Sequence, residues 1–525
     1  MCNSKWKQRS SDKGACHPSC DADGGYRQRG LNRREFIAAT GIATAAGFSL
    51  PTLVDGALGH SEKLRRQQPI SRPLKVQPVF NCEIYQRNAA TSWRWTGAIQ
   101  NEQELREEEQ RIRQDLDKMA SSADFPLEVC PLITVRNVEQ AVAVTKNDYD
   151  VLIIYAARRN RKVLEALASP DRWNLMFVRH RSGPLYYMYI GAHAHFLRKT
   201  RDEFGQPGMD VHDIVVDDHA ELLWRLRALY GLKNILGKRI VAVGGAGAWG
   251  VDGRGAPGRA QQTWKLDIVP VSYPELGERI RKSQQNQVLV NRCHSEADRY
   301  LGQKNVVIET TRVFVYRAFV LCEVFRDLLD EAQTDAITIN HCMSTIMPIA
   351  ETTACLPLSL LNDDGYMAFC ESDFVVIPSG ILLRHISGKP VFLCNPSLPH
   401  DGVLTVSHCT GPRRMNGKEL EPVRILTHYE SDYGAAPKVE MRKEQVVTIL
   451  NPDFAGRRWL GFEGEILDAP FYEICRTQLD IAAKGDDKRL AEEMRGFHWM
   501  VAYGDYLREV GYAVKKIGID WLRLV

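Results

Sequence analysis

Two carboxylates stand close together in the stretch "GYMAFCESDF" (365–374). Glu371 and Asp373 are two residues apart, directly before a long apolar run. On an extended segment, side chains two apart point to one side, so both could bind a hard cation or flank a substrate carbon. If a helix begins here instead, Ser372 or Asp373 caps it and the acids lie at the positive end of its dipole. The sequence leaves both interpretations open.

Histidines that could complete such a site follow later in the chain. His400 and His408 lie on an expected strand–loop–strand after the carboxylates, and His498 lies in an expected strand over 497–504. Imidazole nitrogen is a common metal ligand and a common proton carrier. The ordinary alternative for His498, which has aromatic neighbours, is a core histidine with satisfied hydrogen bonds.

A glycine-rich stretch, "VAVGGAGAWG" (241–250), follows an apolar run that reads as a strand. Such a turn can admit a phosphate or a dinucleotide. It lacks the G-x-G-x-x-G spacing, and Asp267 lies inside the next expected strand rather than at its end. The other interpretation is a tight turn at the edge of a sheet.

The ten cysteines after residue 59 contain no C-x-x-C pair. This spacing indicates neither a disulfide framework nor a zinc ribbon, and we expect most of these cysteines to be small buried hydrophobes.

Charge is distributed unevenly along the chain. The first 59 residues hold eight Lys/Arg against five Asp/Glu, so the rest carries 60 of each sign. A neutral body gives no reason to expect nucleic acid or an anionic membrane surface as a partner.

The leader, residues 1–59, contains paired arginines, Arg33 and Arg34, followed by a weakly apolar stretch of Ala, Gly and Thr. This pattern resembles a twin-arginine export signal and predicts a periplasmic or other extracytoplasmic location. A disordered basic tail with a short amphipathic helix is the alternative. The apolar stretch is shorter than the ~20 residues that cross a bilayer, so we expect no stable membrane span.

Alternating strand-like and helix-like segments predict an α/β protein with mostly parallel sheets. The apolar runs 74–80, 150–157, 174–180 and 213–219 indicate strands, and 101–120 indicates an amphipathic helix. A second unit begins with strands at 236–245 and 265–272 and ends on 335–340. After about residue 390, short strands with Gly, Pro and Asn between them favour an antiparallel sheet or small barrel. The expected domains are 70–235, 236–352 and 353–525.

Three blocks of the chain together resemble the C-terminal half of the L-fucose isomerase and L-arabinose isomerase superfamily. They are 354–374, 383–412 and 475–518. In that group a Leu-rich helix, a D-G-Y/I turn and an E-x-D triplet precede an S/T-G-x-P strand and an "HC"-like strand. A histidine strand and a closing helix follow, in the same order and spacing as here. The resemblance implies two Rossmann-like α/β domains followed by a β-rich, barrel-like domain.

The resemblance also implies aldose–ketose isomerisation of a small monosaccharide on Mn²⁺ or another divalent metal. Moving a proton between C1 and C2 needs a base and stabilisation of an enediolate oxygen, which a cation provides. On this reading Glu371 and His498 match the family's metal ligands, and His400 is a further candidate ligand. Asp373 orients a ligand or transfers a proton, and His408 contacts substrate. Family oligomers place a neighbour over the site, so a trimer or hexamer is expected.

One feature departs from the family's pattern. The family has another acidic ligand upstream, at the end of the strand matched by "AITINHCMST", where this chain has Asn340, His341 and Thr345. Glu351 is the nearest carboxylate and becomes a candidate catalytic residue. A neutral imidazole from His341 in place of the acid weakens the preference for Mn²⁺ or Mg²⁺.

The expected function is therefore a metal-dependent sugar isomerase-like activity. Two alternatives remain: an exported sugar-binding or differently catalytic relative, and a nucleotide-dependent oxidoreductase that uses 241–250. The stretch "TSWRWTGAI" (91–99) is either a sugar-stacking loop or a buried tryptophan corner.

Overall fold

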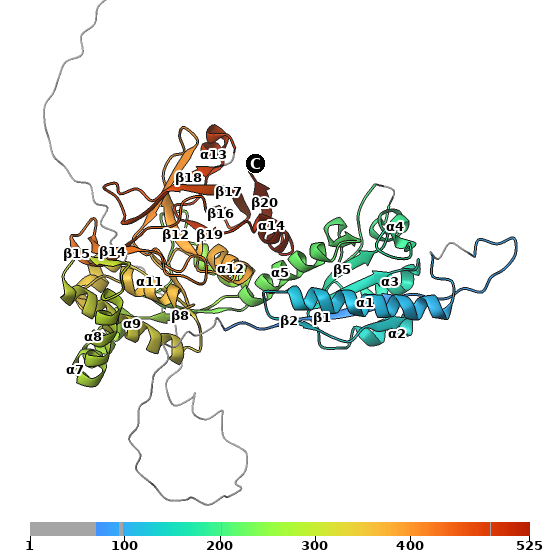
Figure 1. Ribbon diagram of the computed structural model, residues 1–525, viewed down its shortest axis with the longest axis horizontal. Coiled ribbons are helices and arrows are strands. Elements are labelled where there is room, and N and C mark those ends of the chain that lie inside the picture. The colour runs from blue at the N-terminus through green and yellow to red at the C-terminus, as the bar shows by residue number, and fades with distance from the viewer. Residues whose placement is uncertain (1–69, 94–97, 201, 484, 525) are drawn as a thin grey trace, which may run out of the picture. The chain divides into compact units, whose positions relative to one another are not determined.

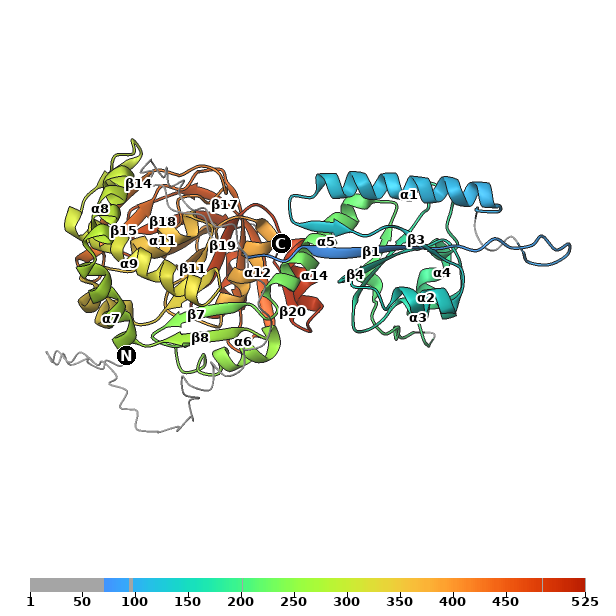
Figure 2. The same ribbon diagram turned by 90° about the horizontal axis from the view of Figure 1, so that it is seen from below.

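The structure is a computed structural model that describes residues 70–93, 98–200, 202–483 and 485–524 (Figures 1 and 2). The expected leader, residues 1–59, lies outside the described residues, as do residues 94–97 of the stretch 91–99. The protein is a mixed α/β molecule with parallel sheets and a closed β-barrel in its C-terminal region. The expected α/β class and the barrel-like C-terminal part are confirmed.

The first sheet is wholly parallel and has the strand order β2-β1-β4-β5-β6, with β3 also paired to β1. It confirms the four strands and the helix expected in this part of the chain. Its strands are β1 (Leu74–Asn81), β2 (Leu127–Val129), β3 (Ile133–Val135), β4 (Val151–Ala156), β5 (Trp173–Val178) and β6 (Ile214–Val216). The helical segments are α1 (Glu102–Ser122), α2 (Val138–Val144), α3 (Arg161–Leu167), α4 (Met188–Gly191), η3 (Ala192–Leu197), η4 (Val211–Asp213) and α5 (His219–Ile235).

Both faces of the first sheet are covered by helices, as Figure 2 shows for α1 and for α2 with α3. Along β4, Ile153 and Tyr155 pack in the cluster that contains α1 and α5, whereas Leu152 and Ile154 pack in the cluster that contains α2 and α3. Successive strand residues point to opposite faces, so a strand buried on both sides must be continuously apolar. That is why 150–157 shows no polar alternation.

The second sheet is also parallel, with the order β11-β10-β7-β8. Its strands are β7 (Arg239–Val243), β8 (Asp267–Val271), β10 (Ala336–Ile339) and β11 (Met367–Phe369). The helical segments around it are α6 (Ala256–Trp264), α7 (Tyr273–Gln285), α8 (Gln287–Leu301), α9 (Arg312–Glu331), η5 (Cys342–Ile346), α10 (Met347–Ala350), α11 (Cys355–Asp363) and α12 (Ile377–Ser387). The expected second domain ends at residue 352, but β11, which belongs to the second sheet, begins at Met367. The domain boundaries themselves stay predictions.

The C-terminal barrel closes because β16 pairs with β17, which joins the two ends of the row β16-β19-β12-β13-β18-β17. β20 adds to β17 in parallel. The barrel elements are β12 (Phe392–Pro396), β13 (Val403–His408), β16 (Val446–Pro452), β17 (Arg458–Asp468), β18 (Thr477–Ala483), α13 (Asp487–Glu493), β19 (Trp499–Tyr503), α14 (Leu507–Lys515) and β20 (Asp520–Arg523). A separate three-stranded sheet contains β9 (Val306–Ile308), β14 (Val423–His428) and β15 (Tyr433–Val439).

Strand alternation also separates the two faces of the barrel wall. On β19, Trp499 and Val501 pack in the cluster formed by the other barrel strands, whereas Met500 and Ala502 pack in the cluster that contains α12. Gly380 of α12 permits this approach, since a Cβ there would lie 2.7 Å from Met500 Cε. The barrel and the second sheet therefore share α12 as a packing partner, which brings the start of β19 close to the segment before α12.

Gly434, at the start of β15, tests how tightly the site region is packed. Its φ is +75° and an added Cβ would lie 2.5 Å from the backbone nitrogen of Thr353. We expect Gly434→Ala to destabilise the protein by about 2 to 3 kcal/mol, because strain and a backbone clash add together. The matched control is Gly388→Ala: φ is +65° but no atom lies within 4 Å of the new Cβ, so only the strain of about 1 kcal/mol remains. Equal shifts of the urea midpoint in both variants would contradict this account.

Asp363, at the end of α11, makes stability depend on pH. Its Oδ1 accepts the backbone N–H groups of Arg413 at 2.7 Å and Arg414 at 2.8 Å. Burial raises its pKa to about 7 against the opposing pull of those N–H groups and the nearby arginines. An unfolded aspartate titrates near pH 4. The buried, ionised carboxylate therefore destabilises the folded state above about pH 7, and this destabilisation disappears below about pH 4. We expect Asp363→Asn to be more stable than the natural protein by about 2 kcal/mol at pH 8, with the difference shrinking toward pH 5 in urea titrations. A difference that does not change with pH would contradict the assignment.

Among the described residues, no single helix is long and apolar enough to cross a membrane. The segments Cys342–Ala350 and Cys355–Asp363 together have the length and composition of a membrane span, but they meet at a bend of 86°.

Candidate functional site

The candidate site lies where strands β10 and β11 of the second sheet end. Three residues after these strands have left-handed backbone: His341 (φ +42°), Glu371 (φ +62°) and Ser372 (φ +45°). Such a conformation costs an L-residue roughly 1 to 2 kcal/mol, so it persists only where the surroundings impose it. The carboxyl ends of parallel strands are also where α/β proteins commonly place their sites.

Asp373 is buried and uses both carboxylate oxygens. Its Oδ1 accepts the backbone N–H of Val375 at 3.0 Å, and its Oδ2 accepts Nδ1–H of His498 at 2.8 Å. Its own carbonyl accepts the N–H groups of Val376 and Ile377, which leads the chain into α12. Asp373 thus caps the turn before α12, whose own N-cap is Val376, and also reaches the histidine. The backbone at Glu371 and Ser372 is left-handed and not extended, so neither sequence interpretation holds in its simple form.

The glycine-rich loop after β7 packs directly against this segment. The N–H of Phe374 donates to the carbonyl of Gly247 at 3.2 Å, and a Cβ on Gly247 would lie 3.2 Å from Asn340 Nδ2. Gly244 has φ +77°, and any Cβ there would collide with the hydroxyl of Tyr273. These glycines therefore have a packing role at the edge of the sheet, as the tight-turn interpretation expects.

His498 enters from the strand end just before β19. Alternation along the strand places it on the side of Met500, which packs in the cluster that contains α12. Its Nδ1 forms the hydrogen bond to Asp373. Its Nε2 lies 3.3 Å from Glu371 Oε2, but the two groups are not aligned for a hydrogen bond. This nitrogen is buried and has no hydrogen-bond partner among the described residues.

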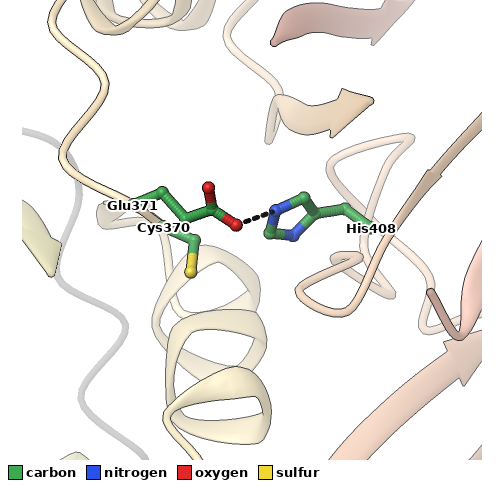
Figure 3. Close-up of side chains that lie close together, drawn as sticks. All are labelled: Cys370, Glu371 and His408. Atoms are coloured by element: carbon green, nitrogen blue, oxygen red, sulfur yellow. Dashed lines mark ion pairs between the residues drawn. The ribbon is translucent and has the colours of Figure 1, made fainter. Parts of the chain in front are cut away.

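His408 reaches the other oxygen of the same carboxylate, as Figure 3 shows. Its Nε2 lies 3.7 Å from Glu371 Oε1, and its Nδ1 shares a 2.9 Å hydrogen bond with Thr410 Oγ1. Donor atoms of Cys370, Glu371 and His408 all lie within 4.8 Å of one another. In each histidine one ring nitrogen is fixed by a neighbour, which leaves the other to face Glu371.

The charges of this group reinforce one another. Burial alone would raise the pKa of Glu371, but the two histidines outweigh it and hold that pKa well below its usual range. Burial alone would lower the pKa of His498, but Asp373 and Glu371 outweigh it and raise the pKa to about 9. Glu371 therefore stays a carboxylate at neutral pH, with positive or polar ring nitrogens on both of its oxygens.

A cavity of about 500 Å³ opens in front of Glu371. The Glu371 side chain is 41% exposed, although both histidines that face it are buried. The cavity is lined by Ala248, Trp249, Gly250, Asn340, His341, Cys342, Met343, Ser344, Cys355, Cys370, Glu371, Asn395, His408, Cys409, His428, Glu430, Cys475 and Phe497. Trp249 and Phe497 stack at 3.8 Å with an interplanar angle of 10° and form an aromatic wall. Such a space suits a small polar molecule with an apolar face.

Two residues suggested by the sequence lie elsewhere. His400 is exposed in the turn before β13, where its Nδ1 contacts the carbonyl of Leu398 at 3.1 Å. Glu351 ends α10 with φ +51° and forms a 2.7 Å ion pair with Arg317. Neither residue lines the cavity. The structure therefore does not support His400 as a ligand or Glu351 as a catalytic residue of this site: a turn directs one outward, and an ion pair holds the other.

Other residues of the site escaped the sequence reasoning. Cys370 directly precedes Glu371, and Glu430 follows β14 in the turn before β15. Asn395 lines the cavity with a buried Oδ1 that has no hydrogen-bond partner among the described residues. The signal that could have found Glu430 is "THYE" (427–430), a histidine and an acid at the end of an expected strand.

The donor set fits a transition-metal dication. Glu371 offers oxygen, His408 offers imidazole nitrogen and Cys370 offers sulfur within 4.8 Å of one another, and His498 adds an imidazole nitrogen 3.3 Å from Glu371 but outside that group. Ligating histidines characteristically donate their other ring N–H to a carboxylate or similar acceptor, as His498 does to Asp373. Two imidazoles with one carboxylate suit Fe²⁺ or Zn²⁺ best and also accept Mn²⁺, whereas Mg²⁺ and Ca²⁺ prefer sites made of oxygen ligands.

No known family model and no curated protein matches this sequence.

Proposed function

We propose that this protein is a divalent-metal-dependent aldose–ketose isomerase-like enzyme that acts on a small monosaccharide. The observation that carries the proposal is the pair of contacts of His498, with Asp373 at 2.8 Å on one ring nitrogen and Glu371 at 3.3 Å on the other. They join a mid-chain acid to a histidine near the C-terminus, the pairing that the resemblance to the L-fucose and L-arabinose isomerases implies.

In this proposal each residue has a separate task. Glu371, His408 and His498 would hold the metal, which supplies Lewis-acid stabilisation of a developing negative charge on a sugar oxygen. Asp373 orients His498, because both of its oxygens are already engaged. It is therefore better suited to positioning than to direct proton transfer. Trp249 and Phe497 present an aromatic face to the carbon side of a polyol.

Proton transfer between C1 and C2 needs a base that faces the cavity. Glu430 is an exposed carboxylate. Among the described residues, Glu371 and Glu430 are the two acids that line the cavity. Because Glu371 is assigned to the metal, we assign the proton transfer to Glu430. A carboxylate from the β14–β15 turn thereby replaces the acid that the sequence lacks after β10.

Several further assignments follow from the same resemblance. The two parallel sheets, each with helices on both faces, support two Rossmann-like domains ahead of the barrel. We propose a homotrimer or homohexamer in which a neighbour covers the site, and export through the leader to the periplasm.

The second candidate is a sugar-binding relative without turnover. Asn340 and His341 line the cavity where the family has an acid, and this observation favours it. A nucleotide-dependent oxidoreductase draws no support from the glycine loop, because Gly244 and Gly247 pack against Tyr273 and Asn340.

The test combines metal analysis with an isomerisation assay. The purified chain is expected to retain a divalent transition metal, and chelation should abolish interconversion of an aldose and its ketose across a panel of pentoses and hexoses. Added Mn²⁺ should restore it. Glu430→Gln is expected to keep the metal but lower kcat at least tenfold, since only the proton-transfer group is lost. Sugar binding without turnover in the metal-loaded protein would favour the second candidate, and absence of both would refute the proposal.

A further inference from the structure

A second cavity, of about 410 Å³, borders the last turn of α12. Its other walls include residues of α5, of the segment between α11 and β11 and of the loop after β13. The residues assigned to the divalent metal do not line it. The cavity can therefore hold a ligand of its own, and two buried side chains indicate which kind.

Arg384 is a buried positive charge on the wall of this cavity. The residue is only 6% exposed, and its Nη2 donates to the carbonyl of Gly365 at 3.2 Å. Its Nε is buried and has no hydrogen-bond partner among the described residues. Burial lowers its pKa to about 10, so the guanidinium stays charged at neutral pH. Asp335 opposes this shift but is itself held by Lys238 in an ion pair of 2.5 Å.

His385, the next residue, also borders the cavity with an unused ring nitrogen. It is 3% exposed, and its buried Nε2 has no hydrogen-bond partner among the described residues. Its ring lies edge-on to that of Tyr230, with 6.2 Å between the centroids. Burial and the positive charges of Lys238 and Arg384 hold its pKa well below the usual range, so the imidazole is neutral at neutral pH. In one tautomer Nε2 carries a proton that an anion can accept as a hydrogen bond.

Three carboxylates also border the cavity, and each already has partners. Asp124 forms an ion pair with Arg227 at 2.5 Å, and Asp364 pairs with an arginine of α9. Asp363 accepts two backbone N–H groups, and burial raises its pKa to about 7. Within the described part of the chain, no carboxylate forms an ion pair with Arg384. A buried charge without such a partner destabilises the folded protein, and a bound anion would offset that cost.

The donors suit a phosphate group better than a carboxylate. Arg227 of α5 and Arg414 of the loop after β13 line the cavity together with Arg384. A guanidinium presents its N–H groups as a planar fork that matches phosphate oxygens. Phosphate has more acceptor oxygens than a carboxylate, so donors from separate elements can share it. A volume of about 410 Å³ is typical of a small-molecule site, so an organic group can accompany the phosphate.

We propose that this cavity binds a small phosphate-bearing anion, with Arg384 and His385 as its buried contacts. Binding is noncovalent: the anion accepts hydrogen bonds from the guanidinium and from the imidazole, and no bond is broken. The site shares no residue with the divalent-metal site, so it goes beyond the proposed isomerase activity and does not depend on it.

The experiment is calorimetric titration of the full chain with sodium phosphate and with a hexose monophosphate, at constant ionic strength. We expect saturable binding of both. Tighter binding of the hexose monophosphate would identify a phosphorylated metabolite as the ligand, and tighter binding of sodium phosphate would identify the inorganic ion.

Arg384→Met should lower the affinity about 10- to 100-fold, because hydrogen bonds from a charged donor are lost. It should leave the anion-free protein at least as stable, because it removes an uncompensated buried charge. His385→Phe keeps a ring against Tyr230, should lower the affinity about tenfold, and serves if the first variant does not fold.

Two further variants serve as controls. Arg279→Gln removes a partly buried arginine that is paired with Glu275 and Glu331 outside the cavity, and it should bind phosphate as the natural protein does. Phosphate can also bind a divalent metal, so Glu371→Gln is titrated as well, and its phosphate affinity should be unchanged. This variant makes failure of the anion site and failure of the proposed isomerase distinguishable.

Three results would overturn the proposal. One is equal phosphate affinity in the natural protein and in both Arg384→Met and His385→Phe. Another is loss of phosphate binding in Glu371→Gln, which would assign the anion to the divalent metal. The third is tighter binding of succinate than of phosphate, which would show that the cavity selects carboxylates.

Discussion

Replacement of Glu371 by glutamine is expected to remove the divalent metal from the purified protein. The carboxylate has one oxygen 3.3 Å from His498 Nε2 and the other 3.7 Å from His408 Nε2. A neutral amide removes the one negative charge assigned to the ion and turns an N–H group toward one of the imidazoles. We expect the affinity for Mn²⁺ to fall about 1000-fold, equivalent to roughly 4 kcal/mol.

The measurement is metal content after dialysis, followed by titration with Mn²⁺. Because the Glu371 side chain is 41% exposed, the fold should be retained, and an unchanged circular dichroism spectrum would establish that. The control is His400→Ala, which removes an exposed imidazole from a turn outside the cavity and should change nothing. Metal retention by Glu371→Gln equal to that of the natural protein would refute the assignment of this carboxylate.

Sequence reasoning located the secondary structure well, because the periodicities are strong. β4 and β5 are buried on both faces, so their apolar runs are continuous, and α1 shows an apolar stripe with Asn101 as a capping residue. The barrel strands were recognised by turn residues at short intervals. Closure of the barrel was less accessible, since it depends on pairing of β16 with β17 and not on any local pattern.

The candidate site could be predicted only in part. Spacing and order pointed to Glu371 and His498, and the structure places these side chains in contact. His400 and Glu351 were suggested by nearness along the chain, but a turn and an ion pair with Arg317 direct them elsewhere. The left-handed backbone at Glu371 has no signature in the sequence, because the residue is neither Gly nor Asn.

The cysteines that line the cavity show a second limit of sequence reasoning. Cys355, Cys409 and Cys475 are far apart along the chain and match no metal-binding spacing. They meet because the start of α11, the end of β13 and the segment before β18 border one cavity. Only tertiary packing creates that convergence, so interpreting the cysteines as ordinary buried hydrophobes was reasonable from their spacing alone.

Asp373→Asn is expected to weaken metal binding although Asp373 does not face the cavity. The asparagine carbonyl can still accept the N–H of Val375, so the cap is kept. Its amide group now points at His498 Nδ1 and donates a hydrogen bond there, which shifts the ring proton to Nε2. A protonated Nε2 cannot bind a metal. We expect Mn²⁺ affinity to fall between tenfold and 100-fold, the usual effect of removing a carboxylate that orients a ligating histidine.

A purely structural role would not produce the same signature. Nitrogen NMR of His498 above pH 9, where the ring is neutral, reports which ring nitrogen carries the single proton, and in Asp373→Asn this should change from Nδ1 to Nε2. The matched control is Ser372→Ala at the adjacent left-handed position, whose buried Oγ has no hydrogen-bond partner among the described residues; neither tautomer nor metal affinity should change. If Asp373→Asn destabilised the fold but kept both the tautomer and the affinity, Asp373 would only cap the turn that precedes α12. In that case the contacts of His498 with Asp373 and Glu371 would be an ordinary buried ion pair, because the protonation of Nε2, which faces Glu371, would not depend on Asp373.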